Sequence, residues 1–247
     1  MAAVYDQEEF FKRYADMDRS RRGLSGAGEW HQLKKMFPSL KGKRVLDLGC
    51  GYGWHCKYAV DAGARSVIGI DASRKMIEEA VKRNLTPEIT YKVCSLEAFD
   101  YPENGFECVI SNLVLHYIED LDDIFRKVHR TLCREGIFLL NIEHPVFTSG
   151  INQEWIADAQ GCLLYWPVDN YFYPGARRVR FLGQEMTKQH HTLTQILMGL
   201  LNAGFCLEAV EEAMPSPKMA EIPGMKDEMR RPMMLMIRGR KRDDRVV

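Results

Sequence analysis

The sequence predicts an α/β fold with a doubly wound, mostly parallel sheet. From Lys43 onwards, short apolar runs alternate with stretches of helical periodicity, which is the pattern of repeated strand–helix–strand units. A glycine-rich turn follows the first apolar run directly. Ligands of open α/β sheets bind beside such turns, at the carboxyl ends of the strands.

The elements follow from these patterns in order along the chain. Strands are predicted over residues 44–48, 66–70, 89–93, 107–111, 136–142, 205–210 and 232–238. Helices are predicted over 54–62, 121–132 and 192–203, and from Ser73 as an N-cap. The helix after Ser73 is expected to turn Met76, Ile77, Ala80 and Val81 towards the sheet.

The same reading predicts one domain in four segments. Residues 1–40 form an N-terminal helical cap, with a break around 23–28, and residues 41–144 form the ligand-binding core. Residues 145–187 are rich in proline and aromatic side chains without periodicity, which indicates an inserted lid. Residues 188–247 return to a helix and strands.

Composition excludes several classes of protein. Lys plus Arg and Asp plus Glu both number 34, so the net charge is zero and a nucleic-acid partner is not expected. No apolar run approaches the ~20 residues that span a bilayer, so no membrane partner is expected either. Seven cysteines without a CxxC pair predict a reducing cytoplasm, no disulfide framework and no metal site. Oligomeric state is left open.

The strongest motif is VLDLGCGYG at residues 45–53, where an apolar strand runs into glycines 49, 51 and 53. A pyrophosphate-binding GxGxxG motif would place its third glycine where this chain has Trp54, which disfavours a dinucleotide. The carboxylate of Asp47 would repel a pyrophosphate but suits a ligand that carries an ammonium and a sulfonium group. S-adenosylmethionine carries both.

A second motif, VIGID at residues 67–71, ends in Asp71. In this architecture, a carboxylate at the end of the second strand accepts hydrogen bonds from ribose hydroxyls. Such a residue serves NAD as well as S-adenosylmethionine, so Asp71 alone does not distinguish them. Met76 lies close enough in sequence to pack on the adenine, with a plain core position as the alternative.

Together these motifs resemble those of the class I S-adenosylmethionine-dependent methyltransferases, in the broad group of small-molecule enzymes. The resemblance covers roughly residues 40–143 well. It implies a Rossmann-like, seven-stranded sheet with an antiparallel edge strand. It also implies methyl transfer from S-adenosyl-L-methionine to an oxygen, nitrogen or sulfur nucleophile of a small molecule, with S-adenosyl-L-homocysteine as the product.

The resemblance also implies which residues surround the cofactor. VLDLGCGYG and GIDAS match the family's first two motifs, and Ser95 stands where the family usually has an acidic residue that holds adenine. Leu96, through its main chain, or Glu97 is expected to replace that contact. Ser111 opens the fourth-strand motif, and an N-terminal aromatic residue such as Tyr14 is expected to close over the ligand. The cofactor-binding set is therefore Tyr14, Asp47, Gly49, Cys50, Gly51, Asp71, Ala72, Met76, Ser95, Leu96, Glu97 and Ser111.

Three histidines are candidates for a general base, because the pKa of histidine lies near neutrality. His144 follows the fifth strand, at the edge of the sheet where the acceptor is expected. His116 and His190 are the second choices, and each has a purely structural role as its alternative.

Three other functions fit the same sheet. One is a cofactor-binding protein without catalysis, because binding motifs do not prove an acceptor. An NAD-dependent oxidoreductase would share Asp71 but conflicts with Trp54 and Asp47. A nucleic-acid methyltransferase of the amino-group type would carry an Asn/Asp-Pro-Pro-aromatic motif, whereas this chain has Ser111-Asn112-Leu113. The methyl acceptor itself is not indicated by the sequence.

Overall fold

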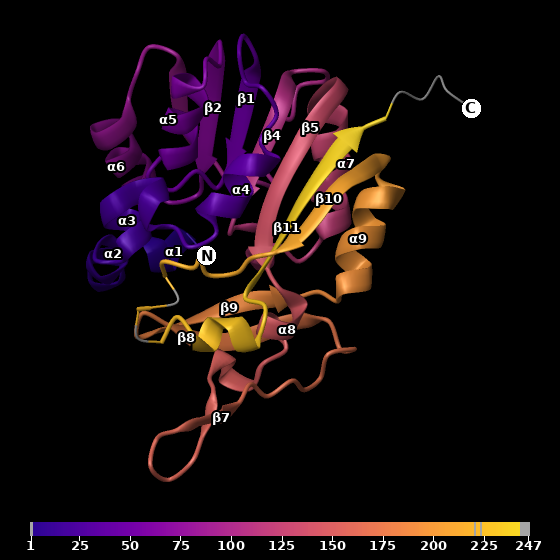
Figure 1. The fold of residues 1–247 in the computed structure, drawn as a ribbon. Coiled ribbons are helices and arrows are strands. Elements are labelled where there is room, and N and C mark those ends of the chain that lie inside the picture. The colour runs from indigo at the N-terminus through magenta and orange to yellow at the C-terminus, as the bar shows by residue number, and fades with distance from the viewer. Residues whose placement is uncertain (1, 220, 223, 243–247) are drawn as a thin grey trace.

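A seven-stranded sheet forms the centre of the protein in the computed structural model, which describes residues 2–219, 221–222 and 224–242 (Figure 1). Its strands are β1 (Arg44–Leu48), β2 (Ser66–Asp71), β3 (Ile89–Val93), β4 (Phe106–Asn112), β5 (Leu132–Glu143), β10 (Phe205–Glu212) and β11 (Met234–Lys241). Their order across the sheet is β10-β11-β5-β4-β1-β2-β3. All seven predicted strands are present.

The predicted mixture of parallel and antiparallel pairing is confirmed. Strands β1 to β5 pair in parallel, whereas β11 runs antiparallel to both β5 and β10, one place in from the edge. Two strands begin two or more residues away from their expected start. Strand β5 begins at Leu132 rather than at 136, and β11 begins at Met234, after Pro232, which has no N–H for a sheet ladder.

Helices cover both faces of the sheet (Figure 1). Helices α4 (Trp30–Met36), α5 (Trp54–Asp61) and α6 (Arg74–Asn84) pack on one face, and α7 (Leu121–Thr131) and α9 (Leu193–Asn202) pack on the other. The hydroxyl of Ser73 accepts the N–H of Met76, as predicted for an N-cap. None of the helices in this described part of the chain is long and apolar enough to cross a membrane.

The inner face predicted for α6 is wrong at one position. Met76, Ile77 and Ala80 are buried, but the side chain of Val81 is 41% exposed. Helix α6 covers the outer strands β2 and β3 at the edge of the sheet. The apolar stripe that the helix can bury there is consequently narrow.

The N-terminal cap lies at the carboxyl end of the parallel strands (Figure 1). It contains α1 (Ala2–Tyr5), α2 (Glu8–Ala15), α3 (Asp18–Arg22) and the short helix η1 (Gly23–Gly26). The Asp6 carboxylate accepts hydrogen bonds from the Ser73 hydroxyl at 2.6 Å and from the Lys75 N–H at 3.1 Å. These bonds tie the cap to the start of α6.

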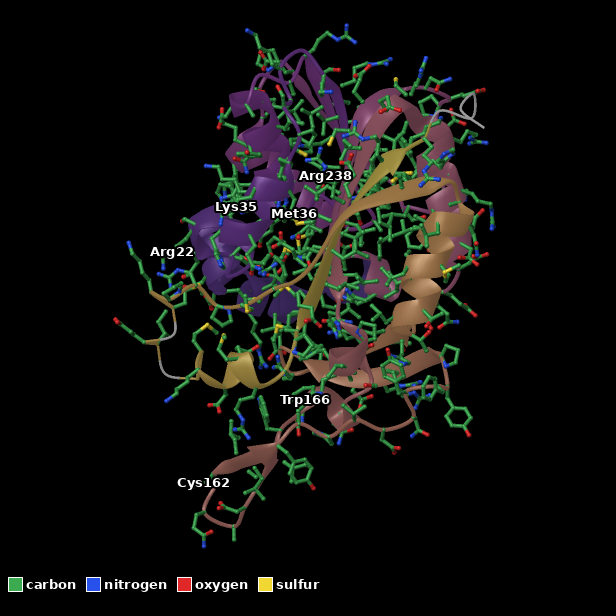
Figure 2. All side chains as sticks on the ribbon, turned by 45° about the vertical axis from the view of Figure 1, so that its right-hand side comes forward. Arg22, Lys35, Met36, Cys162, Trp166 and Arg238 are labelled. Atoms are coloured by element: carbon green, nitrogen blue, oxygen red, sulfur yellow. The ribbon has the colours of Figure 1, made fainter. Side chains whose placement is uncertain are left out.

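The segment after β5 lies at the same end of the sheet and is more regular than expected. It contains α8 (Pro145–Thr148), η3 (Ile151–Gln153), the hairpin β6 (Ile156–Ala157)–β7 (Leu163–Tyr165) and the hairpin β8 (Gly175–Phe181)–β9 (Gln184–His190). Strand β9 therefore continues past residue 187, the expected end of the insertion. The first hairpin projects from the body, with Cys162 at its outer end and Trp166 at its base (Figure 2).

Arg231 fastens the insertion to the segment that precedes β11. Its guanidinium lies 4.4–4.8 Å from the ring centroids of Trp166 and Phe147, and it forms an ion pair with Glu228. Replacing Arg231 with Ala removes these buried contacts and is expected to lower the free energy of unfolding by about 2–3 kcal/mol. Chemical denaturation measures the loss. Arg230→Ala, at a more exposed guanidinium stacked on Trp155, serves as the control and should lose less.

Candidate functional site

A cavity opens at the carboxyl end of the sheet, between the turns that follow β1, β2, β3 and β4 and the helices of the N-terminal cap. Ten of the twelve predicted cofactor-binding residues line it. They are Tyr14, Gly49, Cys50, Gly51, Asp71, Ala72, Met76, Ser95, Leu96 and Glu97. The strand order explains why these residues lie together. Strand β1 lies between β4 and β2, and the carboxyl ends of all three parallel strands meet at the cavity.

The turn after β1 depends on glycine. Gly49 has a φ of +71°, and a Cβ at this position would lie 2.7 Å from the Cβ of Val114. Gly51 has a φ of +52°, and no atom lies within 4 Å of the position its Cβ would take. The chain can therefore turn tightly at Gly49, while Gly51 leaves space for a ligand to approach the main chain.

Asp71 is held in place by the main chain around it. One carboxylate oxygen accepts the N–H of Gly51 at 3.0 Å, and the other accepts the N–H of Ser73 at 2.8 Å. Burial raises the pKa of Asp71 to about 6, against the lowering effect of these two hydrogen bonds. A carboxylate oxygen has two lone pairs, so each oxygen can accept one further hydrogen bond from the cavity.

Apolar and polar side chains from helix α6 and from the turn after β3 continue the cavity wall. Met76 and Leu96 are almost fully buried, and they present apolar surface on the side of β2 and β3. The Ser95 hydroxyl accepts the N–H of Ala98 at 3.3 Å, and Glu97 is exposed at the rim. The wall at this position therefore offers apolar contact together with polar groups.

Asp47 and Ser111 are not among the lining residues. Asp47 lies under the turn, where it is 1% exposed and Cys56 Sγ donates to its carboxylate at 3.2 Å. Burial raises the pKa of Asp47 to about 7. Ser111 is fully buried in β4. Both lie within their strands, one residue before the last, and not in the turns that line the cavity.

The structure adds cavity residues that the sequence motifs did not indicate. Arg19 lines the cavity and donates to both carboxylate oxygens of the buried Glu29, at 3.2 and 3.0 Å. Tyr5 and Tyr117 also line it, and their hydroxyls are 2.9 Å apart. No local spacing points to these residues, because they come from the cap and from a turn that only the tertiary fold brings together.

The three candidate histidines lie outside the cavity lining, and two have both ring nitrogens engaged. His190 Nε2 contacts the carbonyl oxygen of Tyr171 at 2.9 Å, and its Nδ1 lies 2.6 Å from the Thr148 hydroxyl. His144 Nδ1 accepts the N–H of Val146 at 3.0 Å, and its Nε2 lies 3.1 Å from a carboxylate oxygen of Glu212. Burial lowers the pKa of both residues. Both imidazoles therefore support local structure.

His116 is differently placed. It lies in the short helix η2 (Leu115–Tyr117), directly before the cavity residue Tyr117, and their ring centroids are 4.4 Å apart. Its Nδ1 is buried without a hydrogen-bond partner among the described residues, and its Nε2 lies 3.8 Å from a carboxylate oxygen of Glu143. Burial lowers the pKa of His116 to about 4, so the imidazole is neutral at pH 7.

Comparisons with known proteins agree with this geometry. The profile of a family described as "Methyltransferase domain" matches residues 46–140. A structure from Listeria monocytogenes, assigned to the S-adenosylmethionine-dependent methyltransferases, has 45% sequence identity and a TM-score of 0.85 over 90% of this chain and 100% of that chain. An S-adenosylmethionine-dependent methyltransferase from Mesorhizobium loti has 37% identity and a TM-score of 0.81, over 88% of this chain and 100% of that one.

The chain belongs to the S-adenosylmethionine-dependent methyltransferases. The methyltransferase is also 30% identical, over 97% of both chains, to an uncharacterized protein of Haemophilus influenzae. Membership of this family removes the NAD-dependent oxidoreductase as an alternative and establishes the Rossmann-like fold.

S-adenosyl-L-methionine is the cofactor of the methyltransferase, and the cavity suits its chemistry. A carboxylate with free lone pairs at Asp71 matches ribose hydroxyls, and the buried side chains of Met76 and Leu96 match a flat base. Arg19 lines the cavity, and Glu29 takes only one of its guanidinium nitrogens, so its other N–H groups can donate to a carboxylate. The open space beside Gly51 allows the ligand to reach the main chain.

Proposed function

We propose that the methyltransferase transfers a methyl group to an oxygen, nitrogen or sulfur nucleophile of a small molecule. The observation that carries this proposal is the packing of the N-terminal cap beside the cavity. The hydroxyls of the cavity residues Tyr5 and Tyr117 are hydrogen-bonded, and buried Phe10 of the cap packs on Val179 and Met186 of the β8–β9 hairpin. A concave site bounded in this way by side chains suits a small molecule.

The residues of the cavity are assigned parts of the cofactor by their chemistry. Asp71 accepts hydrogen bonds from the ribose hydroxyls, and Met76 and Leu96 enclose the adenine with Ser95 and Glu97 at its polar edge. Gly49, Cys50, Gly51 and Ala72 provide main-chain contacts, and Tyr14 closes the cavity from the cap. Asp47 and Ser111 support these turns from behind. The four segments predicted from the sequence act in this proposal as one domain.

Arg19 is assigned to the methionine carboxylate. Replacing Arg19 with Ala removes a charge-assisted hydrogen bond, so we expect S-adenosylhomocysteine to bind about tenfold more weakly or worse. Calorimetry with 5′-methylthioadenosine provides a matched control, because this ligand has the nucleoside but no amino-acid part. Its affinity should be unchanged in the Arg19 variant. Equal weakening for both ligands would show that Arg19 only supports the cap.

His116 is proposed as the general base. S-adenosylmethionine supplies an electrophilic methyl group, and the protein has to align the acceptor and remove its proton. Nδ1 of the neutral His116 imidazole has no hydrogen-bond partner among the described residues, and it is assigned to accept that proton next to the cavity residue Tyr117. His144 and His190, which already have hydrogen-bond partners on both nitrogens, then serve to hold the insertion on the sheet.

Label transfer tests the proposed acceptor class. The purified enzyme is incubated with methyl-labelled S-adenosylmethionine and a cell extract that has been divided into small molecules, RNA and protein. We expect time-dependent label in the small-molecule fraction, with no transfer by the Asp71→Ala variant. Label that accumulates in RNA or protein instead would reject the small-molecule acceptor and retain the methyltransferase activity.

A further inference from the structure

A buried charged cluster joins the insertion to the end of β5. It consists of His116 from η2, Glu143 from β5, Gln153 from η3 and Lys188 from β9. The Lys188 ammonium donates to Glu143 and, at 3.1 Å, to Gln153 Oε1. Gln153 Nε2 donates to the other carboxylate oxygen of Glu143 at 3.2 Å. The cluster is not part of the cavity wall, yet it contains the proposed base.

Lys188 is unusual among the cations of the insertion because its side chain is 4% exposed. Its ammonium lies 5.4 and 5.8 Å from the ring centroids of Phe181 and Phe147, so aromatic faces surround the part that Glu143 and Gln153 leave open. By contrast, Arg180 on the same hairpin is exposed. A buried ammonium group needs an ion-pair partner, and the partner of Lys188 is the carboxylate of Glu143, which lies outside the β8–β9 hairpin.

The carboxylate of Glu143 faces two groups that can carry a proton or a positive charge. Lys188 contacts it directly, whereas His116 Nε2 is 3.8 Å away. Burial disfavours the ionised carboxyl, but attraction from His116 and Lys188 and hydrogen bonds from Lys188 and Gln153 lower the pKa of Glu143. Without Lys188, a buried carboxylate would face His116 without a permanent counter-charge. The imidazole could supply that charge only by taking up a proton.

The other titratable groups near His116 do not compensate for Lys188. Tyr117, on the same short helix, and Tyr5 from α1 share a hydrogen bond through their hydroxyls. Burial raises the pKa of both tyrosines, so both are neutral. Glu143 from β5 and Lys188 from β9 are thus the two charged groups that act on His116.

We propose that Lys188 is a positioning residue, which neutralises Glu143 and thereby disfavours protonation of the proposed base His116. Because Lys188 is carried by the β8–β9 hairpin, the segment that packs on the N-terminal cap also shifts the pH at which this base takes up a proton. Docking of the hairpin and protonation of His116 are therefore coupled. This inference rests on the proposed function of His116.

Ring-nitrogen NMR of the histidines in the free enzyme tests the coupling without any acceptor. His116 is assigned from the spectrum of the His116→Gln variant. In the wild-type enzyme, His116 should stay neutral down to about pH 5, in line with its pKa of about 4. In Lys188→Met, its titration midpoint should rise by about one pH unit or more. The double variant Lys188→Met with Glu143→Gln should restore a low midpoint, and Arg180→Met should leave the midpoint unchanged.

Each result decides the inference. A wild-type His116 that titrates at its ordinary pH overturns it, and this result does not depend on whether Lys188→Met folds. A midpoint unmoved in folded Lys188→Met, or uptake of the proton by Glu143 alone, also overturns it. The pH dependence of label transfer separates the two proposals. One outcome is that the NMR titration midpoint of His116 rises in Lys188→Met while the pH at which the transfer rate falls on the acid side stays the same. That result would retain the coupling and reject His116 as the base.

Discussion

Replacing Asp71 with Ala is expected to weaken binding of S-adenosylhomocysteine by more than about 100-fold. The proposed role of Asp71 is to accept two ribose hydrogen bonds with one carboxylate, and hydrogen bonds to a charged group contribute roughly 1.5–3 kcal/mol each. Isothermal titration calorimetry measures the loss. Asp100→Ala, at an exposed aspartate outside the cavity lining, is the matched control and should bind normally. A loss of less than about fivefold in a folded Asp71→Ala protein would contradict the assignment.

The affinity should also depend on pH through the same carboxyl. The pKa of Asp71 in the free enzyme is about 6. The ionised form accepts hydrogen bonds from the ligand, so protons compete with binding, and affinity should fall as pH decreases below about 6. Asp71→Asn binds more weakly and should lose this dependence. An equal dependence in both proteins would assign it to another group, such as Asp47.

Replacing His116 with Ala is expected to reduce label transfer by about 10²–10⁴-fold, which is the usual contribution of a general base. Binding of S-adenosylhomocysteine should be unaffected, because the proposed contact of His116 is with the acceptor and not with the cofactor. His144→Ala and His190→Ala should instead lower the melting temperature, since each removes a ring whose two nitrogens have structural partners. Near-normal transfer by His116→Ala, or a far larger loss in His144→Ala, would reverse the assignment.

The sequence was sufficient for the parts of the site that depend on local backbone. Strand β1 is followed by Gly49 and Gly51, whose positive φ angles allow a tight turn, and the apolar run of β2 ends at Asp71. Neighbouring parallel strands then bring these positions together. The same local reasoning could not tell that Asp47 and Ser111 are buried and do not line the cavity.

The remaining features depend on contacts between distant segments. Lys188 and Glu143 are 45 residues apart, and Arg19 reaches the cavity only because the cap folds over the sheet. Burial alternates along β8, with Arg177, Val179 and Phe181 on its inner side. Because Arg177 is polar, only two apolar residues mark this alternation in the sequence. The choice among the three histidines as the general base likewise required knowledge of their hydrogen-bond partners, and the sequence does not show which residues pair.

A crystal structure of the enzyme with S-adenosylhomocysteine tests the central claim most directly. The account predicts that both ribose hydroxyls lie within hydrogen-bond distance of Asp71, with the amino-acid carboxylate at Arg19. It also predicts that the sulfur faces the side of the cavity bounded by Tyr5 and Tyr117. A ligand whose ribose lies away from Asp71, or whose sulfur faces open solvent rather than these tyrosines, would contradict the proposed site and its enclosed small-molecule acceptor.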